Sequence, residues 1–362
     1  MIMMAIRVPG AKLISITVFM MIGSFVFMAC GGNSSGGEIR IQGAGATFPN
    51  PLYQKWFSQY NAVHPNVKFD YQSIGSGGGI KQISSRTVDF GGTDAPMKDE
   101  ELKAAQGEIL HIPTVLGAVV ITYNLQGIDQ SLKLTPESIG GIFLGSIKKW
   151  NDPIISSSNP GVNLPPNDIT VVHRSDGSGT TFVFTDYLSK VSPEWKDKAG
   201  AGTAVNWPAG LGAKGNEGVT GQVKQTPNSI GYTELIYAEQ NKLPYAFIKN
   251  AAGEFIKPSL DSVTAAAASA ASQMPEDFRV SITNAPGRDA YPLSSYTYLL
   301  VYKEQQDQAK GRELVAFLRW ALHGGQQTAK DLLYAPLPAG VIEKADTKIG
   351  SITYQGKPIA SN

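Results

Sequence analysis

The sequence predicts an α/β protein built of two lobes, and three observations lead to this prediction. The chain has 362 residues, which exceeds the roughly 250 to 300 at which a single hydrophobic core stops growing. From Glu38 onwards, short apolar runs of strand character alternate with segments of helical spacing. Gly-rich turns repeatedly stand after a strand and before a helix, and in open parallel sheets ligands bind at that edge.

Residues 1–29 are predicted to be a signal peptide, because two basic residues precede an uncharged, largely apolar run that ends in small residues. The only cysteine, Cys30, follows Phe27-Met28-Ala29. This context resembles a bacterial lipobox and makes Cys30 the predicted lipidation site, although Phe27 stands where that motif usually has an aliphatic residue. The alternatives are an ordinary signal peptide with a spare thiol and a single spanning helix, for which the run is barely long enough.

Residues 30–37 are predicted to be the lipidated cysteine and a short tether. The segment is rich in Gly and Ser, a composition typical of a flexible linker. The reach of such a linker grows only as about 5 to 6 Å times the square root of its length. The folded part of the chain is therefore expected close to the surface that holds Cys30.

The remaining chain is read as an ordered series of strands and helices. Apolar and β-branched runs predict the strands, and apolar residues at helical spacing predict the helices. The predicted strands are Ile39–Ile41, Val67–Ile74, Val88–Phe90, Val115–Tyr123, Ile169–Val172, Ile230–Tyr232 and Tyr296–Tyr302. The predicted helices are Leu52–Tyr60, Ile80–Arg86, Thr135–Phe143, Thr181–Lys190, Gly218–Lys224, Val263–Ala271 and Glu313–His323.

The overall charge argues against nucleic acid as a partner. Lys plus Arg number 31 and Asp plus Glu number 30, so the chain has no strong basic field. Charged residues make up 17% of the chain, against about 25% in typical proteins. Any specificity for an anion must therefore arise locally.

Three loops rich in Gly and hydroxyl residues are the candidate binding site. They are Gly43–Pro49, Gly75–Gly79 and Arg174–Thr181. Each is placed between a predicted strand and a predicted helix, where backbone N–H groups and hydroxyls meet the positive end of a helix dipole. A single loop of this kind is about as often plain turn chemistry, but three that converge predict an oxyanion site.

Two aspartates refine this hypothesis. Asp176 stands two residues from Arg174, and a charge-assisted pair between them would hold the guanidinium while it donates to a ligand. Asp94 has no such neighbour. A carboxylate that faces an oxyanion is useful if the ligand carries a proton, as hydrogen phosphate does and sulfate does not. The alternative, given equal weight, is that Asp94 caps a helix that opens at Pro96.

At these loops the sequence closely resembles the PstS family, the phosphate-binding proteins of bacterial phosphate ABC importers. The resemblance covers essentially everything after the tether. Its motifs are GAGATFP at 43–49, GSGGGIKQI at 75–83, VDFGGTDAP at 88–96, RSDGSGTTFVF at 174–184, KKWNDP at 148–153 and NSIGY at 228–232. One departure is Gly77, where members of the family often have a second serine, and only a modest effect on affinity is expected from it.

The resemblance implies the role of each site residue. Thr47 and Ser76 would donate through hydroxyls, Phe48 through its backbone N–H, and Asp94 would accept the proton of the ligand. Arg174, held by Asp176, would donate its guanidinium. The implied set is completed by Ser178, Gly179 and Thr180, which would surround the remaining oxygens.

The resemblance also implies a periplasmic-binding-protein fold of type II-like form, with two hinged lobes and the ligand in the cleft between them. Lobe 1 would comprise residues 38–123 and 290–362, and lobe 2 residues 124–289. The implied partners are inorganic phosphate and the permease subunits of a phosphate ABC importer. The protein is expected as a lipid-anchored monomer in the periplasm or on the outer face of the cell membrane, with no metal or other cofactor.

The main rival is an enzyme that acts on phosphate esters, with Ser178 as nucleophile. A nucleophilic serine needs a base, and the four histidines do not supply one. Strand alternation turns His173 away, His64 and His111 look like loop or strand-edge residues, and His323 ends a helix, where it suits the dipole. Gly177-Ser178-Gly179 also lacks the spacing of a G-x-S-x-G elbow, and the sequence shows neither a phosphate-binding P-loop nor a His/Cys metal cluster. The chain is therefore predicted not to be an enzyme. Two further alternatives remain. One is a binding protein for another oxyanion, and the other is a surface adhesin or scaffold with the family fold whose site binds no ligand.

Overall fold

A computed structural model describes residues 37–128, 130–271 and 274–360 of the chain. The predicted signal peptide, Cys30 and all of the predicted tether except Gly37 lie outside these residues. Among the helices that the structure describes, none is long and apolar enough to cross a membrane.

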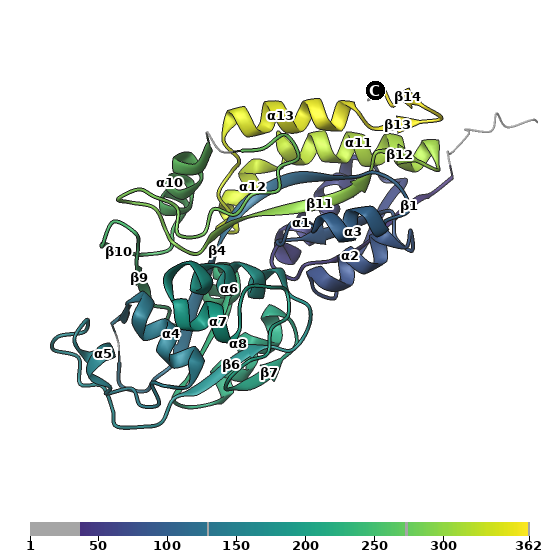
Figure 1. Ribbon diagram of the computed structural model, residues 1–362. Coiled ribbons are helices and arrows are strands. Elements are labelled where there is room, and N and C mark those ends of the chain that lie inside the picture. The colour runs from purple at the N-terminus through teal and green to yellow at the C-terminus, as the bar shows by residue number, and fades with distance from the viewer. Residues whose placement is uncertain (1–36, 129, 272–273, 361–362) are drawn as a thin grey trace, which may run out of the picture. The chain divides into compact units, whose positions relative to one another are not determined.

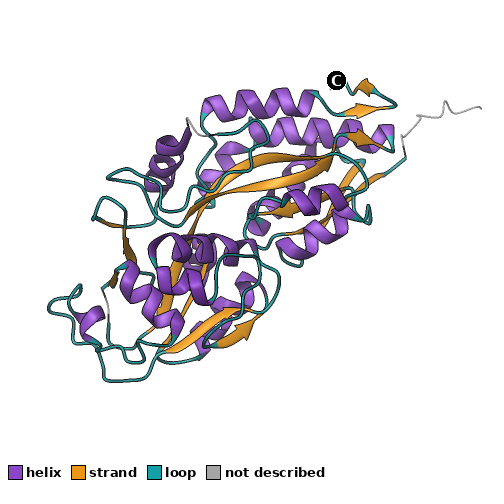
Figure 2. Ribbon diagram, in the orientation of Figure 1, coloured by secondary structure: helices purple, strands orange, loops and turns teal. Residues whose placement is uncertain are grey.

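Helices and strands alternate along the described chain (Figures 1 and 2). The strands are β1 (Ile39–Gly45), β2 (Val67–Ser73), β3 (Phe90–Thr93), β4 (Ile109–Asn124), β5 (Lys133–Leu134), β6 (Thr170–Arg174), β7 (Leu211–Ala213), β8 (Ser229–Glu234), β9 (Phe247–Lys249), β10 (Phe255–Ile256), β11 (Ser294–Tyr302), β12 (Glu304–Gln305), β13 (Thr353–Tyr354) and β14 (Lys357–Pro358). The helices are α1 (Asn50–Val63), α2 (Ser76–Ser84), α3 (Asp99–Ala104), α4 (Pro136–Leu144), α5 (Pro153–Ser156), α6 (Gly179–Val191), α7 (Pro193–Lys198), α8 (Gly215–Gln225), α9 (Leu235–Asn241), α10 (Leu260–Ala270), α11 (Gln308–Leu322), α12 (Gln326–Asp331) and α13 (Ala339–Gly350).

One mixed sheet carries the main strands, in the order β2-β1-β3-β11-β4-β8-β6-β7. The long strand β4 changes partner along its length. Its residues up to Ala118 pair with β11, and its residues from Val119 pair with β8. The sheet therefore has two halves, one with β1, β2, β3 and β11 and one with β6, β7 and β8, which β4 joins. Within each half the strands β1–β3 and β6–β8 pair in parallel.

Burial explains why β4 can serve both halves. All of its residues except the last are buried, as expected for a central strand that is covered on both faces. The predicted strand begins only at Val115, but β4 already begins at Ile109 and continues through Pro113. The register against β11 shifts there, because Thr297 pairs with Val115 and Tyr298 with Pro113. Such a bulge accommodates a proline within a strand.

The other predicted elements agree in order and type with the structure, and their ends differ by a few residues. The strand predicted at Val88–Phe90 is β3, which begins at Phe90 and runs to Thr93. The helix predicted from Ile80 is α2, which already begins at Ser76. Both shifts matter for function, because they place Asp94 directly after a strand and Ser76 at the first residue of a helix.

The C-terminal helices belong to the half of the sheet that contains β1. Figure 1 shows α11 and α13 side by side, and α11 also contacts β1. Phe317 of α11 packs against the rings of Phe57 and Tyr60 in α1 and of Phe69 in β2, with ring centroids 4.5 to 5.4 Å apart. The start and the end of the chain thus share one aromatic core.

Removing this aromatic contact should destabilise the protein. Phe317 is fully buried, so we expect Phe317→Ala to lower the free energy of unfolding by about 3 to 5 kcal/mol in urea denaturation. Leu211, whose relative exposure is 48%, provides the control, since Leu211→Ala should change that free energy by less than about 0.5 kcal/mol. Similar effects of the two variants would contradict the packing described.

Candidate functional site

The three predicted loops lie between a strand and a helix, as their composition indicates. The loop at 43–49 joins β1 to α1, the loop at 75–79 opens α2 after β2, and the loop at 174–181 joins β6 to α6. The first and second loops belong to one half of the sheet and the third to the other. The carboxyl ends of parallel strands therefore bring all three into one region.

Direct hydrogen bonds join the two halves at these loops. The backbone N–H of Gly179 donates to Ser76 Oγ at 3.0 Å, and the backbone N–H of Gly77 donates to Gly177 O at 2.9 Å. Thr47 Oγ1 accepts from Asn216 Nδ2 at 2.9 Å. Predicted residues from both halves of the sheet thus come together.

The close approach of the loops requires glycine at two positions. Gly75 has φ +90°, and a Cβ there would lie 2.4 Å from Asp176 Oδ2. A Cβ on Gly179 would lie 2.4 Å from Ser76 Oγ and 2.5 Å from Asp94 Oδ2. Real Cβ atoms do not come this close, so any larger residue would push the loops apart.

Arg174 and Asp176 form the predicted pair. Arg174 Nε donates to Asp176 Oδ1 at 2.8 Å and Nη2 to Oδ2 at 2.5 Å, the two-pronged geometry that makes such pairs strong. Asp176 Oδ1 also accepts from the backbone N–H of Gly215 at 3.0 Å. Burial tends to raise the pKa of Asp176, but the hydrogen bonds and charge of Arg174 outweigh it and the pKa is lowered. The guanidinium is thereby fixed, and its side chain is only 1% exposed.

Asp94 does not cap a helix. The next helix, α3, begins only at Asp99 with Lys98 as its N-cap residue, so the capping alternative is wrong. Asp94 is instead buried, and its Oδ1 accepts from Thr297 Oγ1 at 2.8 Å. Its Oδ2 is buried without a hydrogen-bond partner. Burial raises the pKa of Asp94 to about 7, against the opposing effects of Thr297, Arg174 and Ser76.

The loop with Thr47 and Phe48 is held through its backbone. Tyr237 OH donates to Thr47 O at 2.5 Å, and Tyr334 OH donates to Phe48 O at 2.6 Å. Both tyrosines are buried. The loop is therefore held through its backbone in addition to the bonds that the Thr47 hydroxyl accepts from Asn216.

Ser178 and Thr180 open helix α6. Ser178 is the N-cap residue, and its Oγ accepts from the backbone N–H of Thr181 at 3.0 Å. Thr180 Oγ1 accepts from Arg174 Nη1 at 3.4 Å and from Asn216 Nδ2 at 3.3 Å. The positive end of the α6 dipole thus lies at the residues predicted to bind an anion.

Five residues at the site escaped the sequence analysis. They are Asn216, Thr297, Glu234, Tyr237 and Tyr334, and all are buried. Glu234 accepts from the backbone N–H of Ile236 through Oε2, while its Oε1 is buried without a partner. Burial raises the pKa of Glu234 well above its usual range. None of these residues stands in a Gly- and hydroxyl-rich motif, so composition carried no signal for them.

The surroundings of Ser178 and of the histidines do not form a nucleophile and base. His173 stacks on the ring of Trp207, with centroids 4.7 Å apart. The reading of His111 as a loop or strand-edge residue is wrong, because it is buried in β4 and its Nε2 accepts from the backbone N–H of Met97 at 3.0 Å. Burial lowers the pKa of His111 to about 3. Within residues 37–128, 130–271 and 274–360, no three His, Cys, Asp or Glu side chains form a possible metal site.

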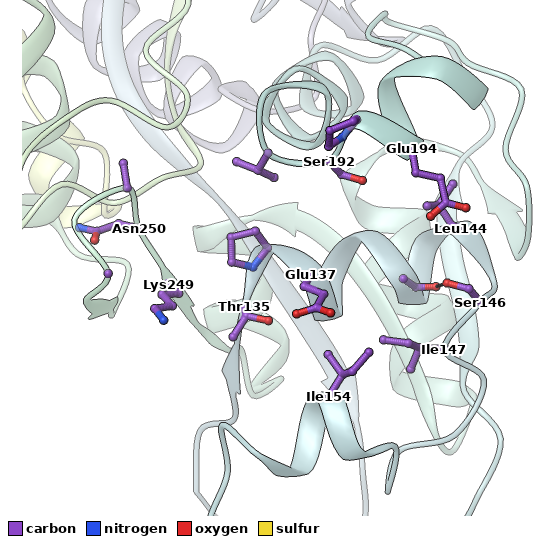
Figure 3. Close-up of a pocket in the computed structure, with 16 residues that line it drawn as sticks. Thr135, Glu137, Leu144, Ser146, Ile147, Ile154, Ser192, Glu194, Lys249 and Asn250 are labelled. Atoms are coloured by element: carbon purple, nitrogen blue, oxygen red, sulfur yellow. Dashed lines mark hydrogen bonds between the residues drawn. The ribbon is translucent and has the colours of Figure 1, made fainter.

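A separate pocket of about 780 Å³ lies outside this site (Figure 3). It is formed around α4, the start of α7 and the segment after β9, and Glu137, Glu194 and Lys249 line it. None of the residues predicted to bind an anion lines it. The chemistry predicted from the sequence therefore does not belong to this pocket.

A family model described as a PBP superfamily domain matches residues 32–323 of the chain. A solved structure with the same fold is the phosphate-binding protein from Stenotrophomonas maltophilia, which has a TM-score of 0.67 at 20% identity, with 86% of this chain and 94% of that chain covered. The predicted periplasmic-binding-protein fold is therefore confirmed.

Sequence relatives are considerably closer. The phosphate-binding protein PstS of Xylella fastidiosa is 48% identical over 85% of this chain and 84% of its own. PstS of Pasteurella multocida is 48% identical over 84% of this chain and 88% of its own. The chain belongs to the PstS family, as the motifs of its loops predicted.

The raised pKa of Asp94 predicts how stability depends on pH. Since the folded-state value of about 7 lies above the ordinary 3.8, the folded chain holds a proton that the unfolded chain has released. The carboxyl therefore disfavours folding increasingly as the pH rises from 4 to 7, and by a constant amount above 7. In a buffer without oxyanions, we expect Asp94→Asn to raise the melting temperature at pH 8, with a gain that shrinks towards pH 4.

Asp176 provides a control, because its ionised carboxylate should stabilise the fold where that of Asp94 destabilises it. Its pKa is lowered, so it contributes stability above its unfolded pKa that is lost as the pH falls. Asp176→Asn should therefore lower the melting temperature at pH 8. An Asp94→Asn protein that melts at or below the wild type at pH 8 would contradict the cost assigned to this buried carboxyl.

Proposed function

We propose that the protein is an extracytoplasmic solute-binding protein that captures inorganic phosphate, as hydrogen phosphate, and delivers it to an ABC importer. The observation that carries the proposal is the contrast between the many fixed donors of the three loops and the unpartnered carboxylate oxygen of Asp94 beside them. The names of the PstS relatives support the same ligand. The proposed binding residues are Thr47, Phe48, Ser76, Asp94, Arg174, Asp176, Ser178, Gly179 and Thr180.

The donors are suited to an anion because their lone pairs are either already occupied or absent. Ser76 Oγ accepts from the backbone N–H groups of Gly179 and Asp94, at 3.0 and 3.3 Å. A hydroxyl has two lone pairs and one proton, so Ser76 has only its proton left to offer. Arg174 and the N-terminal N–H groups of α6 are donors in any case.

The free acceptor is suited to a ligand that carries a proton. Asp94 Oδ2 has no partner, and hydrogen phosphate can donate to it. Sulfate at neutral pH has no proton to donate, so its oxygen would face the carboxylate unbonded. The same carboxylate that costs stability in the unliganded protein would thus reject the most similar competing anion.

We propose that the two halves of the sheet form the two lobes, with boundaries at 38–123 plus 290–362 and 124–289. A crossing within β4 is supported by its change of partner between Ala118 and Val119, a few residues before the proposed boundary, and a second crossing by the return of the chain to β11. A phosphate ion bound by both lobes would favour the closed arrangement over the open one, because only the closed form lets both sets of donors reach it.

We propose that residues 1–29 are an export signal and that Cys30 carries the lipid anchor, so that the protein works as a monomer beside the permease. The lipobox-like sequence before Cys30 supports this proposal. A role in binding and not in catalysis is supported by Ser178, whose Oγ already caps α6. No base is needed for phosphate to bind and leave.

Isothermal titration calorimetry at neutral pH tests the proposed ligand. We expect the wild-type protein to bind phosphate and to bind sulfate far more weakly. Asp94→Asn removes the charged acceptor, so phosphate affinity should fall by roughly 10- to 150-fold. Sulfate affinity should not fall with it, and the phosphate-to-sulfate ratio should drop.

Asp168→Asn makes the same chemical change at an exposed carboxylate that pairs with Lys149, and it should leave both affinities unchanged. Equal binding of sulfate and phosphate by the wild type would refute the role of Asp94 and favour a binding protein of broader oxyanion specificity.

A further inference from the structure

We propose that Asn216 is a positioning residue of the phosphate site, which turns the hydroxyl protons of Thr47 and Thr180 towards the bound anion. The proposal rests on the proposed function. It explains what prevents two hydroxyls, one from each half of the sheet, from turning a lone pair towards the anion. The assignment of donors and acceptors around Asn216 supports it in three steps.

The first step fixes the orientation of the Asn216 amide. Asn216 is the second residue of α8 and is fully buried. Its Oδ1 accepts from the backbone N–H of Glu234 at 3.3 Å and from Thr233 Oγ1 at 3.2 Å. A backbone N–H can only donate, so the oxygen of the amide must face Glu234. The NH₂ group must then face the opposite side.

The second step concerns Thr47. Its Oγ1 accepts from Asn216 Nδ2 at 2.9 Å and from the backbone N–H of Asn216 at 3.2 Å. Both lone pairs of the hydroxyl are therefore occupied. The only capacity left to Thr47 is its proton, which must point away from Asn216.

The third step concerns Thr180. Its Oγ1 accepts from Asn216 Nδ2 at 3.3 Å and from Arg174 Nη1 at 3.4 Å. A guanidinium can only donate, so the lone pairs of Thr180 are also occupied. The Asn216 amide thus donates to both hydroxyls, and the backbone N–H of Asn216 at Thr47 and Arg174 at Thr180 complete the set that leaves each hydroxyl only a proton to offer.

This arrangement affects affinity because it leaves each hydroxyl only one orientation towards the ligand. A free hydroxyl turns its lone pair or its proton to the ligand with similar ease, and fixing it on binding costs entropy. Hydroxyls that are oriented beforehand avoid that cost. An oxyanion offers many acceptors, so donor-only hydroxyls match it, whereas the unpartnered oxygen of Asp94 matches its proton.

Asn216→Asp is the sharpest test, because it preserves shape. The new carboxylate still accepts from Glu234 and Thr233, but its second oxygen accepts the protons of Thr47 and Thr180 and turns them away from the ligand. At pH 8 we expect phosphate affinity to fall by roughly 100-fold or more, since a buried negative charge is added as well. Asn216→Ala removes the amide without adding charge and should cost roughly 5- to 100-fold.

The dependence on pH separates positioning from a structural role. As the pH falls towards 5, the new carboxyl takes up a proton and regains a donor. The loss of affinity in Asn216→Asp, relative to the wild type at the same pH, should therefore shrink, while the loss in Asn216→Ala should stay constant. Losses that are equal in the two variants at every pH would overturn the proposal.

Asn159→Asp is the matched control. Asn159 is buried as well, and its Nδ2 donates to Lys133 O and Ile155 O at 2.8 Å each. This variant should lose thermal stability and keep the phosphate affinity of the wild type. A similar loss of affinity in Asn159→Asp would assign the effect to general destabilisation and overturn the proposal.

A double-mutant cycle covers the case in which Asn216→Asp does not fold. If Asn216 acts through Thr47, the effects of Asn216→Ala and Thr47→Val on phosphate affinity should be non-additive by at least roughly 3-fold. Additive effects would overturn the proposal. A wild-type protein that binds no phosphate would instead overturn the proposed function itself, so titration of the wild type distinguishes the two failures.

Discussion

The burial of Asp94 with one unpartnered oxygen is the constraint on which the rest of the site depends. A buried charge without full compensation is costly, and here burial outweighs the help of Thr297, Arg174 and Ser76, so the pKa rises to about 7. The carboxyl is kept in place by its position directly after β3 and by Thr297 of β11, which lies opposite the bulge of β4. The protein thus retains a destabilising group at the place where hydrogen phosphate would supply the missing partner.

The architecture of the sheet explains how loops from distant parts of the chain meet around Asp94. Because β4 pairs first with β11 and then with β8, both sets of parallel strands direct their carboxyl ends to one region. The remaining requirement is close approach, and glycines meet it: Gly77 and Gly177 form a backbone hydrogen bond of 2.9 Å. A serine at position 77 would place its Cβ 3.2 Å from Gly177 Cα. The departure of Gly77 from the usual pattern of the family therefore eases contact between the halves.

The parts of the site whose residues are close in sequence could be predicted. The parts whose residues are brought together by the pairing of strands could not. Turn composition and the spacing of Arg174 and Asp176 indicated loops and an ion pair, because these interactions join near neighbours. Asn216 lies 169 residues from Thr47, and Thr297 lies 203 residues from Asp94. Such partners follow from strand order and register, which periodicity does not specify. The early start of β4 was missed for the same reason, since the bulge that accommodates Pro113 exists only opposite β11.

The charges of the site show why its specificity must come from hydrogen bonds. Arg174 contributes +1, and Asp176 and Asp94, when ionised, contribute −1 each, so these three groups sum to −1. A dianion would not be drawn to them by net charge, and the whole chain, at +1, offers no strong field either. The attraction has to come from oriented dipoles: the N–H groups at the start of α6 and hydroxyls whose lone pairs are already occupied. The effect of a dipole falls off more steeply with distance than that of a net charge, so we expect the site to distinguish anions by where they carry a proton rather than by how much charge they carry.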